Sequence, residues 1–144
     1  MTDADDLLKL ENQLCFALVT AARNVVAIYR PILEPLGLTH PQYLVMLALW
    51  ERAPRALSDL AADLALDPAT ASPLVKRLEA DGLVQRRRSA DDERRLDIDL
   101  TDAGRLLRDR AIEVPTQVMT AVGMDIEQIA ALRDGLQPFA GRRI

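Results

Sequence analysis

The chain has 144 residues, of which 49% are hydrophobic and 28% charged, so it is long and apolar enough to fold as one domain despite a formal net charge of −4. Its one cysteine and one histidine exclude an internal disulfide and a structural zinc site, and its six scattered glycines exclude a glycine-rich phosphate loop. No apolar run approaches the roughly 18 residues of a membrane span. The acidic start, residues 1–6, lacks the basic segment of a secretion signal, so we expect a cytoplasmic protein without membrane, cofactor or metal.

The first third of the chain predicts two helices. Apolar residues recur at steps of three and four over residues 7–32, which is typical of one long amphipathic helix with a single apolar stripe. Pro31 and Pro35 stand at its expected end, because an interior proline removes a helical hydrogen bond. Pro41 is then a favourable first residue for a second helix. The run 43–50 is almost wholly apolar, so we expect this helix to be buried on several sides.

The middle of the chain has the pattern of a helix-turn-helix. Ser58 is expected to cap one short helix, and Asp67 with Pro68 to open a second one. Gly82 is the expected stop, since glycine readily adopts the left-handed conformation that closes many helices. Pro73 lies inside the second helix and is expected to bend it. Two short helices joined by a brief turn predict a helix-turn-helix.

A β-hairpin is predicted directly after this unit. The apolar period changes from helical to two, which indicates strands over residues 83–88 and 96–100 joined by a charged tip at residues 89–95. In the second strand the apolar residues alternate with Asp97 and Asp99. A helix-turn-helix followed by such a hairpin is a winged helix, so the expected fold class is mainly α with a small β-hairpin wing.

Amphipathic helices flank this central module at both ends, with Thr101 and Asp125 as expected caps of two C-terminal helices. These helices have too few partners within a lone winged helix, and a second copy of the chain offers a symmetric way to bury them. We therefore expect a single domain, residues 1–144, that forms a homodimer. Its expected parts are a winged helix-turn-helix DNA-binding region, residues 41–100, and dimerisation helices in residues 1–36 and 102–144. The alternative is that these helices fold back on their own chain.

The charge distribution favours a nucleic-acid partner more than the net charge does. A net charge of −4 argues against binding to phosphates, but residues 70–95 carry seven basic and five acidic side chains. We expect the first turns of the second short helix to reach base edges in a major groove, and the cations about one turn later to hold phosphates. The arginines of the hairpin tip are expected to enter the minor groove.

The candidate DNA-binding residues are Pro68, Thr70, Ser72, Lys76, Arg77, Arg86, Asp92, Arg94 and Arg95. The alternative is that the arginines are a solvated face paired with the acidic residues 91–93. In a symmetric dimer the two recognition helices lie about 34 Å apart, or a multiple of that distance, so the expected partner is a near-palindromic double-stranded operator.

Three segments resemble a known family. Residues 66–79, Leu-Asp-Pro-Ala-Thr-Ala-Ser-Pro-Leu-Val-Lys-Arg-Leu-Glu, resemble the recognition helix of MarR-type transcriptional regulators. Residues 92–95, Asp-Glu-Arg-Arg, and 100–104, Leu-Thr-Asp-Ala-Gly, are similar to the wing and the following cap of that family. The Asp-Pro-Ala start of the recognition helix differs from the Asp-Ser-Gly usual there.

The N-terminal third resembles one subgroup, the organic-hydroperoxide resistance regulators (OhrR), through residues 10–18 and 36–44. This resemblance implies a repressor that leaves its operator when Cys15 is oxidised by an organic hydroperoxide. The subgroup commonly places tyrosine hydroxyls around the reactive sulfur. Tyr29 matches one of those positions, whereas Val19 and His40 stand where two further tyrosines are expected.

A redox role for Cys15 requires a reactive thiolate and a fate for the oxidised sulfur. Only a thiolate attacks a peroxide at a useful rate. We expect Cys15 well inside the first helix, beyond the turn that the helix dipole favours, with no cation at helical spacing. Activation then comes from elsewhere, with Tyr29 and His40 as candidates, on the same chain or the partner subunit. Without a second cysteine, the sulfenic acid must react with a small thiol or a backbone nitrogen, or be oxidised further.

Other functions remain open at this point. Cys15 is also explained as a small buried hydrophobic residue. In that case a MarR-type repressor responds instead to a small aromatic or phenolic ligand, bound between the helices that carry Phe16, Tyr29, Tyr43 and Trp50. A peroxidase that uses Cys15 is a third possibility, but one cysteine offers no resolving partner. We expect a regulator and not an enzyme.

Overall fold

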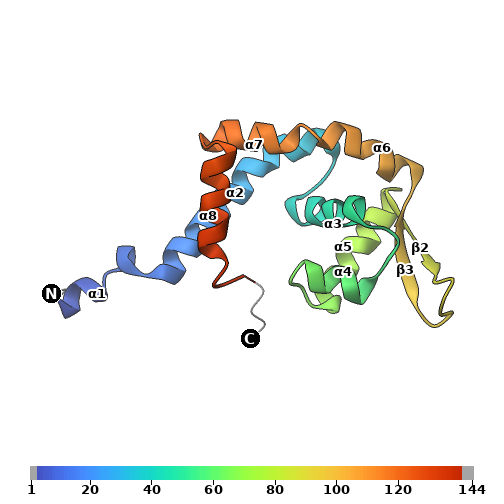
Figure 1. Ribbon diagram of the computed structural model, residues 1–144, viewed down its shortest axis with the longest axis horizontal. Helices are drawn as coiled ribbons and strands as arrows, with labels where there is room; N and C mark the ends of the chain where they lie inside the picture. The colour runs from blue at the N-terminus through green and yellow to red at the C-terminus, as the bar shows by residue number, and fades with distance from the viewer. Residues whose placement is uncertain (1–2, 141–144) are drawn as a thin grey trace.

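The computed structural model describes residues 3–140, which form a series of helices and a small antiparallel sheet at one end of the molecule (Figure 1). The remaining residues of the two expected dimerisation regions, 1–2 and 141–144, lie outside this range. In chain order the elements are α1 (Ala4–Leu7), η1 (Leu10–Asn12), α2 (Leu14–Leu33), η2 (Glu34–Leu36), α3 (His40–Glu51), β1 (Arg55–Ala56), α4 (Leu57–Asp63), α5 (Pro68–Ala80), β2 (Val84–Arg88), β3 (Leu96–Leu100), α6 (Asp102–Ala111), α7 (Val114–Val122) and α8 (Ile126–Leu136).

The N-terminal helix is shorter than its apolar period predicts. The backbone is extended at Lys9 and at Gln13, so α1, η1 and α2 replace one continuous helix. The side-chain amide of Gln13 donates to the carbonyl oxygens of Leu7 and Lys9, both at 2.8 Å. Side-chain bonds of this kind compete with the helical ladder, and apolar spacing does not reveal them. The expectation of one helix over residues 7–32 is therefore wrong before Leu14.

α3 forms the centre of the core. Thr39 and Gln42 build a reciprocal capping box at its start, and Pro41 occupies the first turn. Tyr43, Val45, Met46, Ala48 and Leu49 are buried, which confirms that this helix is covered on several sides. The core also receives side chains from α4, α5, the sheet, α6 and α7.

The predicted helix-turn-helix is formed by α4 and α5. Ser58 does not cap α4: the helix begins at Leu57 after the extended residue Ala56, so Ser58 already lies in its first turn. α5 begins at Pro68 and contains Pro73, and Gly82 follows its end with a φ of +76°, as predicted.

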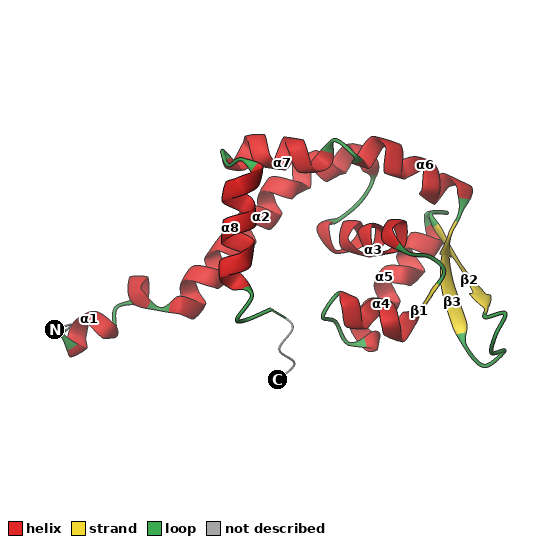
Figure 2. Cartoon of the chain, in the orientation of Figure 1, coloured by secondary structure: helices red, strands yellow, loops and turns green. Residues whose placement is uncertain are grey.

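The predicted hairpin is present and gains a third strand. The strand order is β1-β3-β2, all antiparallel, and β2 pairs with β3 in the register Val84↔Leu100 to Arg88↔Leu96 (Figure 2). An alternating strand ordinarily turns its charged positions to solvent. Asp97 and Asp99 are nevertheless buried, whereas Leu96 is 47% exposed.

The C-terminal part contains three helices. Thr101 and Asp125 cap α6 and α8 through side-chain bonds to Gly104 and Gln128, as predicted. The helix expected after Thr101 ends at Ala111, and a separate helix, α7, starts at Val114. The apolar spacing did not predict this break. α7 packs against α2 (Figure 1).

α2 is long, apolar and mostly exposed. The stretch Leu14–Leu36 is long and apolar enough, by length and composition, to cross a membrane, and 6% of its 18-residue apolar window is buried. The expectation that no stretch reaches this length is wrong once polar interruptions such as Arg23 and Arg30 are averaged over the helix. A helix that packs beside another subunit has the same composition.

Candidate nucleic-acid interface and thiol site

The outer face of α5 carries residues that the sequence assigns to DNA. Ala71, Val75 and Leu78 are buried on its inner face against the core, which turns the opposite face to solvent. Of the expected contacts on this helix, Ser72 is half-buried and the others are exposed: Pro68, Thr70, Lys76 and Arg77. α5 therefore offers hydroxyl groups in its first turns and two cations further along.

Four of the five arginines of the wing are held by partners within the chain. The pairs are Arg86 with Glu79 (3.0 Å), Arg87 with Asp99 (2.7 Å), Arg88 with the carbonyl oxygen of Glu93 (2.6 Å) and Arg95 with Asp97 (3.1 Å). The fifth is Arg94, whose guanidinium has no partner among residues 3–140. Arg94 is thus the wing arginine most available to an outside anion.

Arg86 connects the wing to α5. Its guanidinium and its backbone N–H both donate to the Glu79 carboxylate. These hydrogen bonds hold the pKa of the Glu79 carboxyl below its ordinary value. Arg86 is therefore bound within the chain and links the wing to the candidate recognition helix.

Asp92 shapes the hairpin tip. Its carboxylate accepts a hydrogen bond from the backbone N–H of Arg94 (3.0 Å), and its carbonyl oxygen accepts one from the N–H of Arg95 (3.0 Å). Among the described residues, no ion pair joins a wing arginine to a carboxylate of residues 91–93. The alternative of a solvated face paired with those carboxylates does not match this geometry.

Cys15 is the second residue of α2, and its side chain is exposed. The expectation that it lies beyond the first turn is wrong, because the break at Gln13 starts the helix later than the apolar period predicts. The first N–H groups of a helix have no intrahelical acceptor and carry the positive end of the helix dipole. Cys15 is therefore neither a core residue of this chain nor remote from a favourable helix end.

Tyr29 and His40 lie together, but far from Cys15 on the same chain. Their ring centroids are 4.9 Å apart in an edge-to-face arrangement, and the Tyr43 ring lies 5.9 Å from Tyr29. Cys15 and Tyr29 are both on α2, and the rise between them is about 21 Å along a regular helix. Within one chain, Tyr29, Tyr43 and His40 therefore lie together and Cys15 lies apart from them.

Burial shifts the acid–base properties of this cluster. Desolvation raises the pKa of the Tyr29 and Tyr43 phenols and lowers the pKa of His40. The lowered pKa of His40 disfavours its imidazolium form, the form that would stabilise a thiolate by its charge. His40 and Arg30 line a pocket of about 430 Å³ with Val26, Glu34, Gly37, Leu38, Thr39 and Pro41.

The four aromatic side chains considered for a ligand site do not gather in one chain. Phe16 is 45% exposed near the start of α2. Trp50 donates its indole N–H to the carbonyl oxygen of Gly104 (2.9 Å). Tyr43 and Trp50 line a smaller pocket between α3 and α6–α7, of about 290 Å³, with Leu47, Glu51, Arg108, Ala111, Ile112 and Pro115.

Sequence reasoning did not single out the charged groups buried beside the wing. Arg55 of β1 is 5% exposed and pairs with Asp63 of α4. Asp99 is buried between Arg87 and Arg105. The strand pattern marks the charged positions but not the third strand and the arginines that cover them. No cluster of metal-ligating side chains occurs among residues 3–140.

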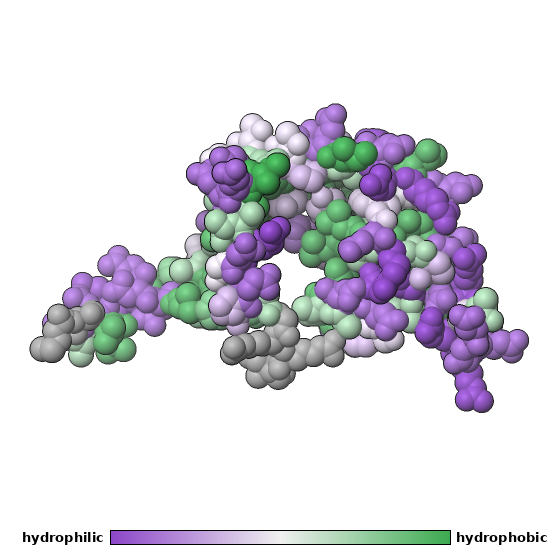
Figure 3. Space-filling model, viewed as in Figure 1, coloured by the Kyte–Doolittle hydropathy of each residue, from purple (hydrophilic) through white to green (hydrophobic). Residues whose placement is uncertain are grey.

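Hydrophilic residues cover the wing, and patches of apolar residues lie among hydrophilic ones over the terminal helices (Figure 3). The large exposed apolar residues of the N- and C-terminal segments are Leu7, Leu8, Leu10, Leu14, Phe16, Val19, Val25, Leu106, Ile112, Ile126, Leu132, Leu136 and Phe139. Large contiguous apolar surface on a monomer is typical of an interaction surface.

The chain is similar to known transcriptional regulators. Residues 38–96 match the family model described as MarR family. Over 136 residues the chain is 38% identical to the "Organic hydroperoxide resistance transcriptional regulator" of Bacillus subtilis (strain 168), with 94% of this chain and 92% of that protein covered.

Solved structures of winged-helix regulators have the same fold. The structure of reduced AbfR bound to DNA gives a TM-score of 0.77 at 31% identity and covers 95% of this chain and 96% of that one. AbfR is a protein of Staphylococcus epidermidis and is also solved in an overoxidised form bound to DNA. CouR from Rhodococcus jostii RHA1, bound to p-coumaroyl-CoA, gives a TM-score of 0.79 at 29% identity, with 95% and 98% covered. The predicted winged-helix fold is confirmed.

Proposed function

We propose a function from one premise: the chain belongs to the MarR family of transcriptional regulators. The protein is a cytoplasmic homodimeric repressor that binds a near-palindromic operator and leaves it when an organic hydroperoxide oxidises Cys15. The observation that carries the redox part is the exposed Cys15 thiol in the first turn of α2. Its relative in Bacillus subtilis is named for organic hydroperoxide resistance.

α5 and the wing hold the DNA. The exposed hydroxyl of Thr70 lies in the first turn of α5, where a helix in the major groove meets base edges, with Ser72 one step further. Lys76 and Arg77 hold phosphates. Arg94, presented by the turn that Asp92 shapes, enters the minor groove, whose negative potential attracts arginine. Pro68, Arg86 and Arg95 position these groups.

Residues 1–36 and 102–144 form the dimer interface. The apolar side chains of α2 and α8 and of the segment before Cys15 are in water in a single chain, and a second copy covers them with twofold symmetry. This arrangement also explains why α2 is apolar enough to resemble a membrane span. Residues 41–100 then lie outside the interface as the two DNA-binding lobes.

The dimer supplies the contacts that Cys15 lacks in one chain. Because Tyr29 is about 21 Å away along α2, the Tyr29–His40 pair that activates a given Cys15 belongs to the partner subunit. Both groups are neutral near neutral pH, since burial raises one pKa and lowers the other, so they act through hydrogen bonds. Val19, where the subgroup has a tyrosine, contributes no hydroxyl.

The reaction is an oxygen transfer to sulfur. The Cys15 thiolate attacks the hydroperoxide, an S–O bond forms as the O–O bond breaks, and the alkoxide leaves as an alcohol after it takes a proton. Sulfur is thereby oxidised to a sulfenic acid and the peroxide is reduced. A small thiol then displaces water from the sulfenic acid to give a mixed disulfide, because the chain has no second cysteine.

A second candidate function is favoured by the pocket between α3 and α6–α7. Its lining is mostly apolar, with Tyr43, Trp50 and Arg108, and it is large enough for a small phenolic ligand. The similar structure of CouR holds p-coumaroyl-CoA. In this alternative a ligand releases the DNA and Cys15 is only structural.

Fluorescence anisotropy on DNA from beside the protein's own gene separates the two. Organic hydroperoxide and, in separate samples, a phenol are added to the wild type and to Cys15→Ser at fixed salt. The redox function predicts release of the wild type and retention of Cys15→Ser. Release of both variants by a phenol, with neither responding to hydroperoxide, supports the ligand function instead.

A further inference from the structure

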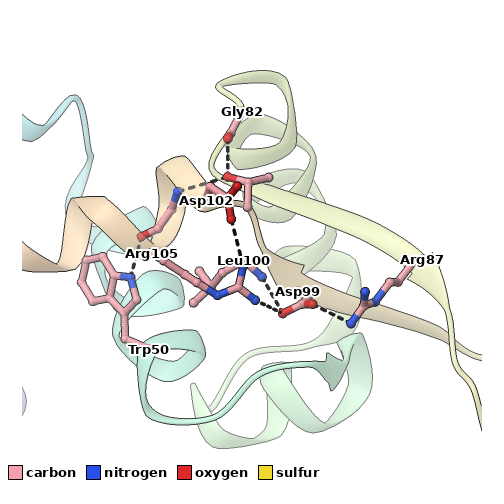
Figure 4. Close-up of polar contacts among 9 residues, drawn as sticks. Trp50, Gly82, Arg87, Asp99, Leu100, Asp102 and Arg105 are labelled. Carbon is pink, nitrogen blue, oxygen red and sulfur yellow. Dashed lines mark hydrogen bonds and ion pairs between the residues drawn. The ribbon is translucent and has the colours of Figure 1, made fainter.

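Asp99 of β3 is a buried carboxylate with partners in three places. Its side chain is 5% exposed. One oxygen accepts from Arg87 of β2 at 2.7 Å, and the other lies 3.4 Å from Arg105 of α6 and 2.8 Å from the backbone N–H of Leu100 (Figure 4). A charge this buried is stable only while such partners remain in place.

The two arginines come from parts of the chain that do not otherwise meet through side-chain bonds. In the strand register Asp99 faces Gln85, so Arg87 reaches it diagonally from the neighbouring strand toward the hairpin tip. Arg105 reaches it from the first turns of α6. Asp99 thus connects the outer half of the wing to α6.

The start of α6 is fixed to the helix-turn-helix independently of this carboxylate. The Thr101 hydroxyl donates to the carbonyl oxygen of Gly82, at the end of α5, at 2.6 Å. Trp50 of α3 donates to the carbonyl oxygen of Gly104 at 2.9 Å (Figure 4). Arg105 therefore projects from a helix end whose position relative to α5 is already set.

Val84, Ile98 and Leu100 anchor the two strands in the core. Among residues 3–140, the contacts of Asp99 with Arg87 and Arg105 are the side-chain bonds that join the wing to α6. β3 pairs with β1 over two residues, Arg55↔Ile98 and Ala56↔Asp97, at its middle and toward the hairpin tip. At the middle of β2, Arg86 pairs with Glu79 of α5. Further out, Asp97 pairs with Arg95 of the same strand segment, which holds nothing outside the wing.

We propose that Asp99 is a positioning residue for DNA binding: it sets the direction of the wing relative to α5 and α6 so that Arg94 meets the duplex. The inference rests on the proposed DNA-binding function. The partially exposed Arg87 and Arg105 are held for this purpose and do not themselves contact DNA.

The sign of one substitution separates positioning from simple electrostatics. Asp99→Asn removes a negative charge near DNA, which by itself strengthens attraction to phosphates. Positioning predicts the opposite, a loss of operator affinity of about tenfold, within the range of couplings measured between linked residues. Asp97→Asn is the matched control, because it removes the same charge from the same strand face and leaves the wing bonded to α6. It frees Arg95 only, so it is expected to lose less affinity than Asp99→Asn.

A double-mutant cycle with Arg94→Ala distinguishes positioning from a general loss of stability. Asp99→Asn is expected to cost little further affinity in the Arg94→Ala background, and both single variants are expected to lower the slope of log affinity against log salt by about one. Thermal unfolding of each variant reports its folded fraction. If Asp99→Asn fails to fold, Arg105→Gln, at a position 54% exposed, replaces it in the cycle with the same expected coupling.

Anisotropy on the operator fragment gives a distinct result for each failure. If the wild type binds the operator but Asp99→Asn and Asp97→Asn have equal affinities, the positioning role is overturned and the proposed function stands. The same holds if the losses of affinity caused by Asp99→Asn and Arg94→Ala multiply in the double variant. Wild type that does not bind operator DNA overturns the proposed function and the inference with it.

Discussion

The Tyr29 ring meets the His40 ring edge to face, with centroids 4.9 Å apart, at the opposite end of α2 from the Cys15 thiol. The aromatic pair joins α2 to the start of α3, where the capping box of Thr39 and Gln42 fixes His40 in the first turn. A functional connection between the pair and the thiol therefore requires a dimer in which the start of α2 from one subunit lies near the end of α2 from the other.

Tyr29→Phe is expected to slow oxidation of Cys15 by about tenfold or more, because removal of a hydrogen-bond donor near a reacting group costs in that range. Dimerisation is expected to be unchanged, since only a hydroxyl is lost. The rate is measured by intact mass at a fixed concentration of hydroperoxide, and the oligomeric state by light scattering. Equal oxidation rates in the two proteins contradict a role for Tyr29.

Mixed dimers test which subunit supplies Tyr29. When Cys15→Ser chains are paired with Tyr29→Phe chains, the cross-subunit arrangement leaves one complete site, so the remaining Cys15 is expected to react at the wild-type rate. Wild type paired with a chain that carries both substitutions is the control, and its remaining Cys15 is expected to react slowly. The reverse order of the two rates places Tyr29 and Cys15 of one chain together.

Protonation of His40 is expected to destabilise the fold in mild acid. Burial lowers its pKa, so between the folded value and the unfolded value of about 6.5 the unfolded chain binds more protons. The free energy of unfolding therefore rises with pH in that window and falls as the pH drops from about 6.5 through the folded value. Urea unfolding at several pH values measures this, and His40→Gln is expected to show a flatter profile. Parallel profiles for the two proteins rule out this contribution.

Gly104 is expected to tolerate no side chain. A Cβ atom there lies 2.1 Å from the backbone oxygen of Leu83, which cannot move away as a side chain can. Gly104→Ala is expected to lower the free energy of unfolding by about 1–3 kcal/mol, the usual cost of overpacking.

Gly135→Ala is the matched control, because nothing lies within 4 Å of a Cβ atom at that helical position. It is expected to raise the free energy of unfolding by about 0.5–1 kcal/mol through helix propensity. Urea denaturation of both variants measures the difference. A neutral Gly104→Ala means that α6 does not approach Leu83 as closely as described.

The two kinds of exposed residue on α5 are expected to affect DNA binding differently. Lys76→Gln removes a phosphate contact, so it is expected to weaken binding to all sequences alike and to lower the salt slope by about one. Thr70→Val removes a hydroxyl at a base edge and is expected to relax sequence preference. Binding to operator and scrambled DNA at several salt concentrations separates these effects. A Lys76→Gln variant with an unchanged slope does not contact phosphate.

The sequence was sufficient for the parts of the fold that local chemistry determines. Gly82, Thr101 and Asp125 end or cap helices as predicted, since their roles depend on neighbours a few residues away. Cys15 was misplaced within its helix because the amide of Gln13 interrupts the helical ladder, a bond with no signal in apolar spacing.

The buried carboxylate of Asp99 was not predicted for a different reason. Its burial depends on Arg105 of α6, which the sequence does not place beside β3. Tyr29 and His40 were candidates from the sequence, but the sequence left open which subunit supplies them, because that depends on how two chains pack. Local patterns therefore predicted the elements, while the charged contacts between elements needed three dimensions.

The most direct test of the central claim follows the oxidation of Cys15 and the release of DNA in one sample. Organic hydroperoxide is titrated into the complex, and operator anisotropy and intact mass are measured at each step. The account predicts that the released fraction rises with the oxidised fraction of Cys15, and that Cys15→Ser stays bound throughout. Release of Cys15→Ser, or wild type that remains bound with Cys15 fully oxidised, contradicts it.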